Sequence, residues 1–324
     1  MDKNRILEIS GLTTHFFVSS GTVRAVENLN LTIDREEIVT IVGESGSGKS
    51  VTALSIMGLI DEPGKIVSGE INFLSHNLLT SSYRKMQSLR GKELSMVFQN
   101  PYTAMHPSMK ISDQMIESII FHEKIKKYDA FKRSIQILEK IGIEEPDMVI
   151  QRYPFEVSAG IIQRIMLAIA LVLRPTLLIA DEPTTNLDSI SQIQFLDLIK
   201  KLRNELKMSV LLITHDFGVV TMMSDKVVVM YAGKSVESGS LSQIIQDPKH
   251  PYSNALLKSV KTLNNNYKLN RLEQIPGEVP DVMRLPEGCS FRTRCSVHED
   301  ICFRTPPNIV LKDNRTTSCW LYQN

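Results

Sequence analysis

The sequence predicts an α/β protein built on a parallel sheet, and three observations indicate this class. Three short runs at 177–181, 209–216 and 226–233 are almost continuous in Val, Ile and Leu, as strands covered on both faces are. A segment of helical periodicity at 191–206 separates the first two runs. A glycine-rich GxxxxGKS motif at 43–50 lies between an apolar strand and a helix.

The N-terminal part of the chain predicts strands of a different kind. Apolar and polar residues alternate over 6–12, 22–34 and 36–43, a pattern typical of antiparallel, half-buried strands. The pattern becomes helical over 51–60 and ends at the breaker cluster 61–64 (DEPG).

The middle of the chain predicts helices, and the end predicts a separate part. Amphipathic periodicity runs from about 112 to 143, which indicates two helices. The composition changes near Asp247-Pro248, and the tail beyond it carries paired prolines, all the cysteines and little periodicity. We interpret this tail as a small separate module.

Composition limits the partners of the chain. Its 324 residues carry 37 Lys and Arg against 36 Asp and Glu, a net charge of +1 that favours neither nucleic-acid coating nor strong steering to a membrane. The start, MDKNRILEIS, lacks the apolar stretch of a secretory signal. Gln163-Arg164 and Pro175 interrupt the most apolar region, so we expect a soluble chain that needs another anchor to work at a membrane.

The segment Gly43–Ser50 (GESGSGKS) is the strongest chemical signal. Its glycines allow backbone N–H groups to converge on an anion, and the following helix adds its positive N-terminal end. Lys49 is expected to reach the β- and γ-phosphates of a nucleotide, and Ser50 to bind Mg²⁺. The competing interpretation is a glycine-rich turn without a ligand.

Polar residues at the ends of apolar runs form a second signal. Asp181 ends LLIAD in the manner of a Walker B carboxylate that binds Mg²⁺, and Glu182 next to it is expected to polarise water. His215 ends another apolar run and is a candidate γ-phosphate contact, while Gln99 follows LSMVF. Taken alone, these side chains are equally compatible with a surface acidic pair, a structural histidine and an unremarkable glutamine.

The turn Ser158-Ala159-Gly160 precedes the helical segment IIQRIMLAIALVL. Ser158 is a plausible N-cap, and the helix start would form a second phosphate-binding device about 110 residues after the first. One chain seldom needs two such devices on one phosphate. We therefore expect a composite site, in which the phosphate loop of one subunit faces the capped helix of another.

Four cysteines lie close to the C-terminus with the spacing C-x5-C-x6-C-x16-C. In a reducing compartment this clustering favours a four-coordinate metal or an iron–sulfur cluster over two disulfides, and zinc or free thiols are the alternatives. The cysteines are Cys289, Cys295, Cys302 and Cys319.

These motifs, in this order from about Leu7 to Ser259, resemble the ATP-binding subunits of ABC transporters. The similarity includes the Q-loop glutamine, the signature turn followed by Gln163-Arg164, the D-loop Asn186-Leu187-Asp188 and the switch histidine. Within that superfamily the chain is most similar to the oligopeptide and dipeptide importer ATPases. The supporting text is VGESGSGKS, IADEPTTNLD, DPKHPYSNALLKSV with its His250-Pro251-Tyr252, and the cysteine-containing tail.

The resemblance implies an ABC nucleotide-binding domain at 1–259 and a C-terminal extension at 260–324. The domain would contain a RecA-like core, an antiparallel β-subdomain and a helical subdomain at about 100–174. It implies catalysis by Glu182, His215 and Lys49, and Mg²⁺ bound by Ser50, Gln99 and Asp181. The nucleotide would be bound by Phe16 (or Phe17) stacking on adenine, Gly43, Glu44, Ser45, Gly46, Ser47, Gly48, Lys49, Ser50, Val51, Gln99, Asp181, Ser158, Gly160 and Asp188.

The resemblance also implies partners and a location. These are a second, non-identical ATPase subunit, two membrane-spanning permease subunits and an extracytoplasmic peptide-binding protein, with no nucleic acid. The chain would lie at the cytoplasmic face of the membrane, use ATP and Mg²⁺, and carry a structural [4Fe–4S] cluster on its four cysteines.

Two departures and three alternatives accompany this interpretation. Ala159 stands where the family has glycine in its signature turn, and the segment 100–109 differs from the family at a position expected near the permeases. The alternatives are an ATPase of a nickel or metallophore importer, a soluble ABC ATPase of repair or translation, and a nucleotide binder without hydrolysis. Intact Glu182 and His215 disfavour the last.

Overall fold

The computed structural model describes residues 4–264, 275–311, 313 and 315–323. The chain divides into a first unit (1–33, 38–79 and 214–324) and a second unit (34–37 and 80–213), and each is described by itself. Among the described residues, no helix combines the length and the apolar character that crossing a bilayer requires.

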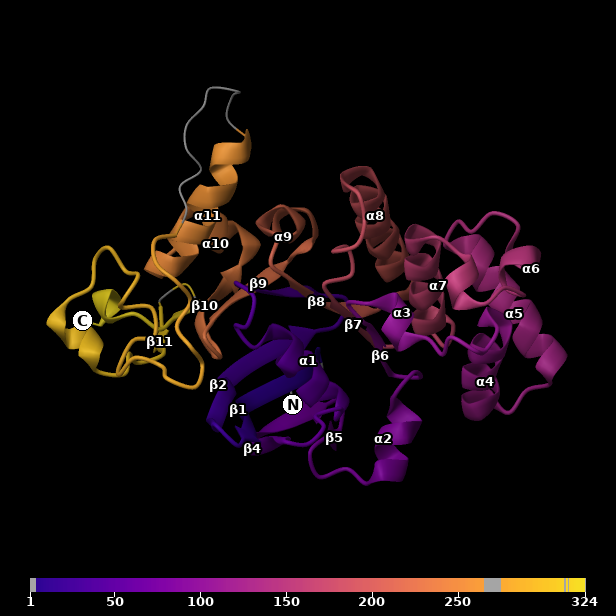
Figure 1. Cartoon of the computed structure of the whole chain (residues 1–324), viewed down its shortest axis with the longest axis horizontal. Helices are drawn as coiled ribbons and strands as arrows, with labels where there is room; N and C mark the ends of the chain where they lie inside the picture. Colours follow the sequence, from indigo (N-terminus) through magenta and orange to yellow (C-terminus); the bar gives the residue numbers. More distant parts are fainter. Residues whose placement is uncertain (1–3, 265–274, 312, 314, 324) are drawn as a thin grey trace. The chain divides into compact units, whose positions relative to one another are not determined.

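An antiparallel sheet of order β2-β1-β4-β5 forms the N-terminal part of the first unit (Figure 1). It consists of β1 (Arg5–Val18), β2 (Gly21–Asp34), β4 (Gly64–Phe73) and β5 (His76–Asn77). Ile9 of β1 pairs with Ile71 of β4, and both are buried. The strands expected at 6–12 and 22–34 are confirmed.

Strand β3 (Ile38–Val42) corrects the expectation for 36–43. All five of its residues are buried, and it pairs in parallel with β9 (Lys226–Tyr231), so it is not an antiparallel, half-buried strand. A five-residue run of Ile, Val and Thr can be covered on both faces. The acidic residues just before it made the segment look like a half-buried strand with alternating polar residues. Helix α1 (Lys49–Met57) follows the glycine-rich loop, and α9 (Phe217–Met223) contacts β3.

The C-terminal tail is built onto the first unit. Strand β12 (Thr316–Thr317) pairs with β10 (Lys234–Ser240), and β11 (Ile309–Val310) pairs with β12. The unit also contains α10 (Leu241–Gln246), α11 (Pro251–Asn264), η2 (Asp300–Phe303) and η3 (Trp320–Tyr322). The tail thus shares a sheet and a hydrophobic core with the strands before it, while the boundary near 260 stays a prediction.

The second unit contains three parallel strands, and helices lie before and between them in the chain. Strand β7 (Leu177–Asp181) pairs with β6 (Leu94–Val97) and with β8 (Ser209–Thr214). The helices of this unit are α2 (Tyr83–Leu89), α3 (Pro101–Ala104), α4 (Ile111–Glu123), α5 (Lys127–Lys140), α6 (Pro146–Val149), η1 (Pro154–Glu156), α7 (Ala159–Leu171) and α8 (Ser189–Leu206). The two helices expected between 112 and 143 are confirmed as α4 and α5, which pack against each other and against α7.

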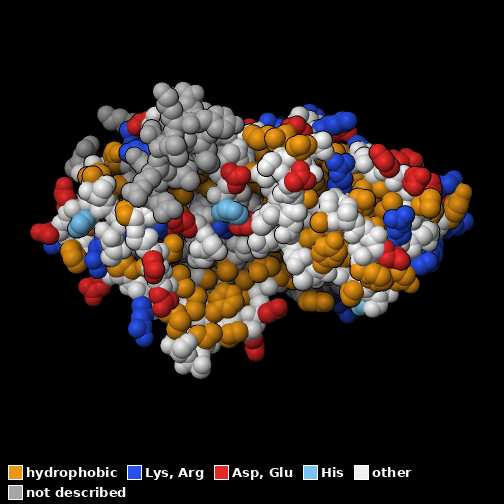
Figure 2. Space-filling model, turned by 45° about the horizontal axis from the view of Figure 1, so that its top comes forward, with side chains coloured by type: hydrophobic (Ala, Val, Ile, Leu, Met, Phe, Trp, Pro, Cys, Tyr) orange, Lys and Arg blue, Asp and Glu red, His pale blue; other side chains and the backbone are white. Residues whose placement is uncertain are grey.

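Charges are mixed on the surface. On the face that Figure 2 draws, acidic and basic side chains are interspersed, and apolar side chains gather in a patch near the lower centre of the view.

Candidate nucleotide-binding site

The loop between β3 and α1 requires glycine at two positions. A Cβ on Gly43 would lie 2.2 Å from the carbonyl oxygen of Met230, and one on Gly48 would lie 2.2 Å from that of Ala25. Gly48 also has φ of 99°, a conformation that favours glycine. The backbone therefore approaches β9 and β2 too closely for any side chain, which fixes the shape of the loop.

The same loop presents groups suited to an anion. Gly48 is the N-cap of α1 and provides no side-chain acceptor, and the first turn of α1 contains no acidic residue. The Ser47 hydroxyl is buried without a hydrogen-bond partner. Lys49, which is 5% exposed, donates to the carbonyl oxygens of Gly43 (2.9 Å) and Glu44 (3.0 Å). A helix start, an orphaned hydroxyl and a buried ammonium form a phosphate cradle.

Two residues from the C-terminal part of the chain hold this loop. Arg294 forms two hydrogen bonds with the Glu44 carboxylate, at 2.7 and 3.1 Å, and Tyr252 Oη accepts the Glu44 N–H at 2.9 Å. The sequence reasoning missed Arg294 altogether and used Tyr252 only as part of a resemblance. No local pattern connects residues 250 positions apart.

In the second unit, the predicted carboxylates lie at the C-terminal end of β7. Asp181 is buried. The Glu182 carboxylate accepts hydrogen bonds from Gln99 Nε2 at 3.0 Å and from Thr185 Oγ1 at 3.1 Å. Glu182 has φ of 44°, and its N–H donates to Ile213 at 2.9 Å. The structure thus brings the side chains of Gln99 and Glu182 together, a contact that the sequence did not predict.

The signature turn has the expected position. Ser158 is the N-cap residue of α7 with extended backbone, as predicted, and its exposed hydroxyl makes no capping hydrogen bond. Ala159 is the first residue of α7 and does not have a positive φ, and a Cβ on Gly160 would meet nothing within 4 Å. The Ser158 carbonyl accepts the Ile162 N–H at 2.9 Å as the helix begins, whereas its hydroxyl makes no capping bond. Among the described residues, no atom lies close enough to Gly160 to require glycine there.

Four other predicted residues are positioned as follows. Asp188 caps α8 by accepting from the Ser191 hydroxyl, Ser191 N (3.0 Å) and Ile190 N (3.1 Å), and these bonds lower the pKa of its carboxyl. The three remaining residues are His215, exposed directly after β8, Val51 in the first turn of α1, and Phe16, whose ring lies against Gly64.

The alternative adenine partner is more open. Phe17 is 51% exposed, and its ring is edge-on to that of His15 at 6.2 Å. The choice between Phe16 and Phe17 stays a prediction.

All four cysteines line one cavity of about 150 Å³ in the first unit. Burial raises the pKa of the Cys289 and Cys295 thiols, and it raises that of Cys319 to about 11. Among the described residues, no three His, Cys, Asp or Glu side chains are grouped closely enough for a single metal ion. The walls of this cavity are otherwise largely apolar, with Val297, Ile301 and Leu321 among them.

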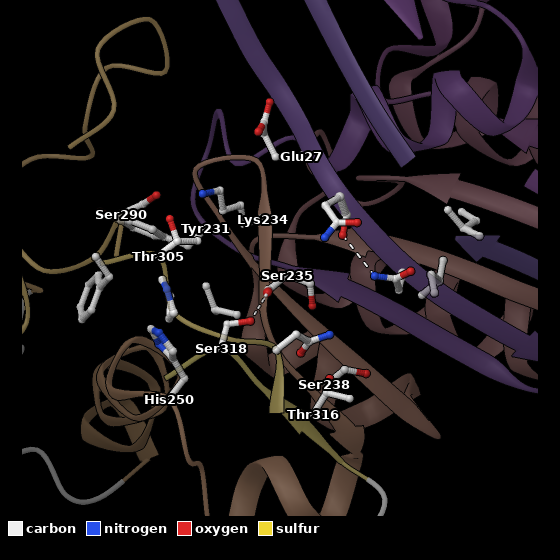
Figure 3. A pocket seen from close by; sticks show the side chains of 18 of the residues that line it. Glu27, Tyr231, Lys234, Ser235, Ser238, His250, Ser290, Thr305, Thr316 and Ser318 are labelled. Atoms are coloured by element: carbon white, nitrogen blue, oxygen red, sulfur yellow. Dashed lines mark hydrogen bonds between the residues drawn. The ribbon is translucent and has the colours of Figure 1, made fainter. Parts of the chain in front are cut away.

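A larger cavity of about 590 Å³ adjoins the cysteine cavity, since His250, Cys289, Phe291 and Pro306 line both (Figure 3). It is lined by β1, β2 and β10 and by parts of the tail, with Lys234, Tyr231 and Ser290 among its walls. Of all the predicted site residues, only Cys289 contributes to it. This cavity is therefore not the nucleotide site.

Comparison with protein families and curated proteins agrees with these observations. The family described as "ABC transporter" matches residues 26–185, and "Oligopeptide/dipeptide transporter, C-terminal region" matches 236–302. The oligopeptide transport ATP-binding protein OppD of Bacillus subtilis is 43% identical over 98% of this chain and 89% of its own. The dipeptide transport ATP-binding protein DppD of the same organism is 41% identical over 98% and 95%.

Solved structures show the same fold. A dimeric ATP-binding cassette, MJ0796, in a post-hydrolysis state with ADP and Pi, has a TM-score of 0.66 at 26% identity and covers 73% of this chain and 99% of its own. The cbiO1 protein of Clostridium perfringens, part of an ABC transporter complex, has a TM-score of 0.65 at 25% identity over 84% and 98%. The chain belongs to the ATP-binding proteins of the oligopeptide and dipeptide ABC transporters.

Proposed function

We propose that this chain is the ATPase subunit that drives import of small peptides through a membrane ABC transporter. The observation that carries the proposal is a phosphate cradle, with buried Lys49 and the orphaned Ser47 hydroxyl, in a chain similar over 98% of its length to oligopeptide transport ATP-binding proteins.

Each residue has a role in that reaction. The loop Gly43–Ser50 binds the phosphates, with Lys49 neutralising their charge, and Phe16 stacks on adenine. Ser50, Asp181 and Gln99 would hold Mg²⁺, an ion that takes few protein ligands and would help neutralise the charge of the phosphates. Glu182 orients the attacking water and His215 contacts the γ-phosphate.

The site is completed by a second subunit. The exposed Ser158 hydroxyl makes no capping bond, and among the described residues no atom lies within 4 Å of a Cβ built on Gly160. A partner's γ-phosphate would use both groups, and the related cassette MJ0796 is itself dimeric. We take the partner to be a different ATPase chain.

Coupling to the permeases runs through the segment after Gln99. Tyr102 in α3 is 45% exposed, and its hydroxyl donates to the carbonyl of Val157, the residue before the signature turn, at 3.4 Å. A displacement of α3 by a permease subunit would be transmitted through this hydrogen bond to the turn at Ser158–Gly160, which contacts the partner's nucleotide. The chain would therefore sit at the cytoplasmic face of the membrane, held by two permease subunits that an extracytoplasmic binding protein supplies with peptide.

The cysteine cavity is proposed to hold a [4Fe–4S] cluster. The support is that all four cysteines line one cavity, since four thiolates are the usual ligands of such a cluster. When bound, the cluster would supply a cross-link between the loops that carry the cysteines. Absorption near 400 nm and iron analysis of anaerobically purified protein test this, and a colourless, zinc-loaded sample contradicts it.

The transport function is tested by reconstitution with the cognate permeases and binding protein in proteoliposomes. We expect ATP-dependent uptake of short peptides that a Lys49→Ala subunit abolishes. Uptake of nickel or a metal chelate in place of peptide would assign the alternative importer class. ATPase activity without any response to permeases would indicate a soluble ABC ATPase.

A further inference from the structure

The first turn of the phosphate loop is held from the opposite end of the chain. Glu44, the second residue of the GxxxxGKS motif, places its carboxylate against the Arg294 guanidinium in a two-pronged arrangement. The Arg294 side chain is only 4% exposed and that of Glu44 is 25% exposed. A bidentate ion pair that is largely shielded from water has a defined geometry, which an exposed surface pair lacks.

Tyr252 holds the backbone of the same residue. Its hydroxyl oxygen accepts the Glu44 N–H at 2.9 Å, and the side chain is fully buried. The carboxylate and the amide of Glu44 are thus both fixed by residues that follow position 250. The carbonyl oxygen of Glu44 is the one to which Lys49 donates at 3.0 Å, so the two residues also set the surroundings of the lysine that meets the phosphates.

Arg294 is itself firmly held. Its Nε donates to the Pro276 carbonyl at 3.0 Å and its Nη1 to Tyr231 Oη at 3.4 Å. The ring of Tyr231 packs on that of Tyr252, with centroids 4.6 Å apart, and on that of Phe291 at 5.2 Å. These contacts fix the position of the Arg294 guanidinium, so a movement of the loop would break its hydrogen bonds with Glu44. Arg294 therefore restrains the loop.

The charge of Glu44 gives the pair a second consequence. A carboxylate in a loop that binds triphosphate would repel the ligand, and Arg294 neutralises it.

We propose that Arg294 and Tyr252 are positioning residues of the nucleotide site, through which the C-terminal part of the chain holds the phosphate loop in its binding conformation. The inference rests on the proposed function, because it concerns the same ATP site. It assigns to the tail a task in nucleotide binding besides carrying the cysteines.

The test measures binding of a fluorescent ATP analogue with Mg²⁺ to the purified full-length chain, together with ATPase kinetics of the assembled transporter. Arg294→Gln is expected to raise Kd and KM about tenfold or more, with kcat nearly unchanged. Arg294→Lys keeps the positive charge but cannot form two parallel hydrogen bonds with the carboxylate, so its Kd and KM are expected to lie between those of the wild type and of Arg294→Gln. Arg315→Gln is the matched control, since Arg315 is also a buried tail arginine but binds Asp247.

A double-mutant cycle separates positioning from general destabilisation. If Arg294 acts through Glu44, the Kd change caused by Arg294→Gln nearly disappears in a Glu44→Ala background. An equal change in both backgrounds, or an equal change in Arg315→Gln, overturns the proposal. So does wild-type affinity in Arg294→Gln.

Tyr252→Phe keeps the proposal testable should Arg294→Gln fail to fold. It removes only the acceptor of the Glu44 N–H and is expected to raise Kd about threefold to tenfold. Unchanged affinity in a folded Tyr252→Phe chain would contradict the role of this residue. Failure of the wild-type chain to bind the analogue at all would instead contradict the proposed function.

Discussion

At the scale of single residues, Glu182 combines chemistry with local strain. Its φ of 44° is uncommon for a residue other than glycine and costs of the order of 1 kcal/mol. The strain persists because the N–H bonds to Ile213 and the carboxylate bonds to Gln99 and Thr185. The carboxylate is therefore aimed before any substrate arrives.

Ala159 is a residue whose departure from the family pattern has no backbone cost. It begins α7 with a negative φ, so glycine would relieve no strain. We expect Ala159→Gly to change the ATPase rate of the assembled transporter less than about twofold and to lower helix stability by less than about 1 kcal/mol. A several-fold rise in ATPase would show that the methyl group tunes the partner's site.

His250 predicts a pH dependence of stability. It is buried, its Nδ1 accepts the Tyr252 N–H at 3.1 Å, and burial lowers the pKa of the imidazole from 6.5 to about 3. Between these values the unfolded chain binds more protons than the folded one, so the contribution of His250 is complete above pH 6.5 and is lost as the pH falls toward 3.

We expect the thermal unfolding midpoint of the wild type to fall more between pH 7.5 and pH 5 than that of His250→Asn. The asparagine oxygen can still accept the Tyr252 N–H but has no titration in this range, so it isolates the histidine from other groups. Equal slopes in the two proteins would contradict the account.

At the scale of elements, the phosphate loop is shaped by its neighbours on β9 and β2. Gly48→Ala introduces a Cβ 2.2 Å from a backbone oxygen at φ of 99°, whereas Gly46 at φ of 76° has open space around it. Urea unfolding is expected to show a loss of about 2 kcal/mol or more for Gly48→Ala and about 1 kcal/mol for Gly46→Ala. Equal losses would mean that the close approach to Ala25 does not constrain the loop.

The elements divide into those that sequence can reveal and those that it cannot. The loop Gly43–Ser50, the strand ending at Asp181 and the pair α4 and α5 carry their own local patterns, and each was predicted correctly. The parallel pairing and full burial of β3 were not predicted, because they depend on β9 and other elements far along the chain. The contact between Arg294 and Glu44 was not predicted either, since no local spacing encodes a contact between residues so far apart in the chain.

At the scale of the whole molecule, we expect occupancy of the cysteine cavity in the tail to be coupled to ATP binding at the phosphate loop. Arg294 precedes Cys295 directly, so an occupant that fixes the cysteine loops also fixes the residue that holds Glu44. Binding free energies are coupled reciprocally in such a case. Cysteine chemistry and ATP affinity should then respond to each other.

We expect chain with a reconstituted cysteine site to bind the ATP analogue more tightly than chain stripped by chelation under anaerobic conditions, by about threefold or more. The difference should shrink in Arg294→Gln, which breaks the connection while leaving the four cysteines in place. Identical Kd values for loaded and stripped wild type would show that the tail acts on the loop independently of its occupant.

ATP hydrolysis with Glu182 orienting the attacking water is tested by the steady-state ATPase rate of the assembled transporter. The rate is compared between wild type and Glu182→Gln, together with analogue binding to both. We expect kcat to fall about 100-fold or more with nucleotide binding retained, as on loss of a general base. Equal rates in the two proteins would contradict it.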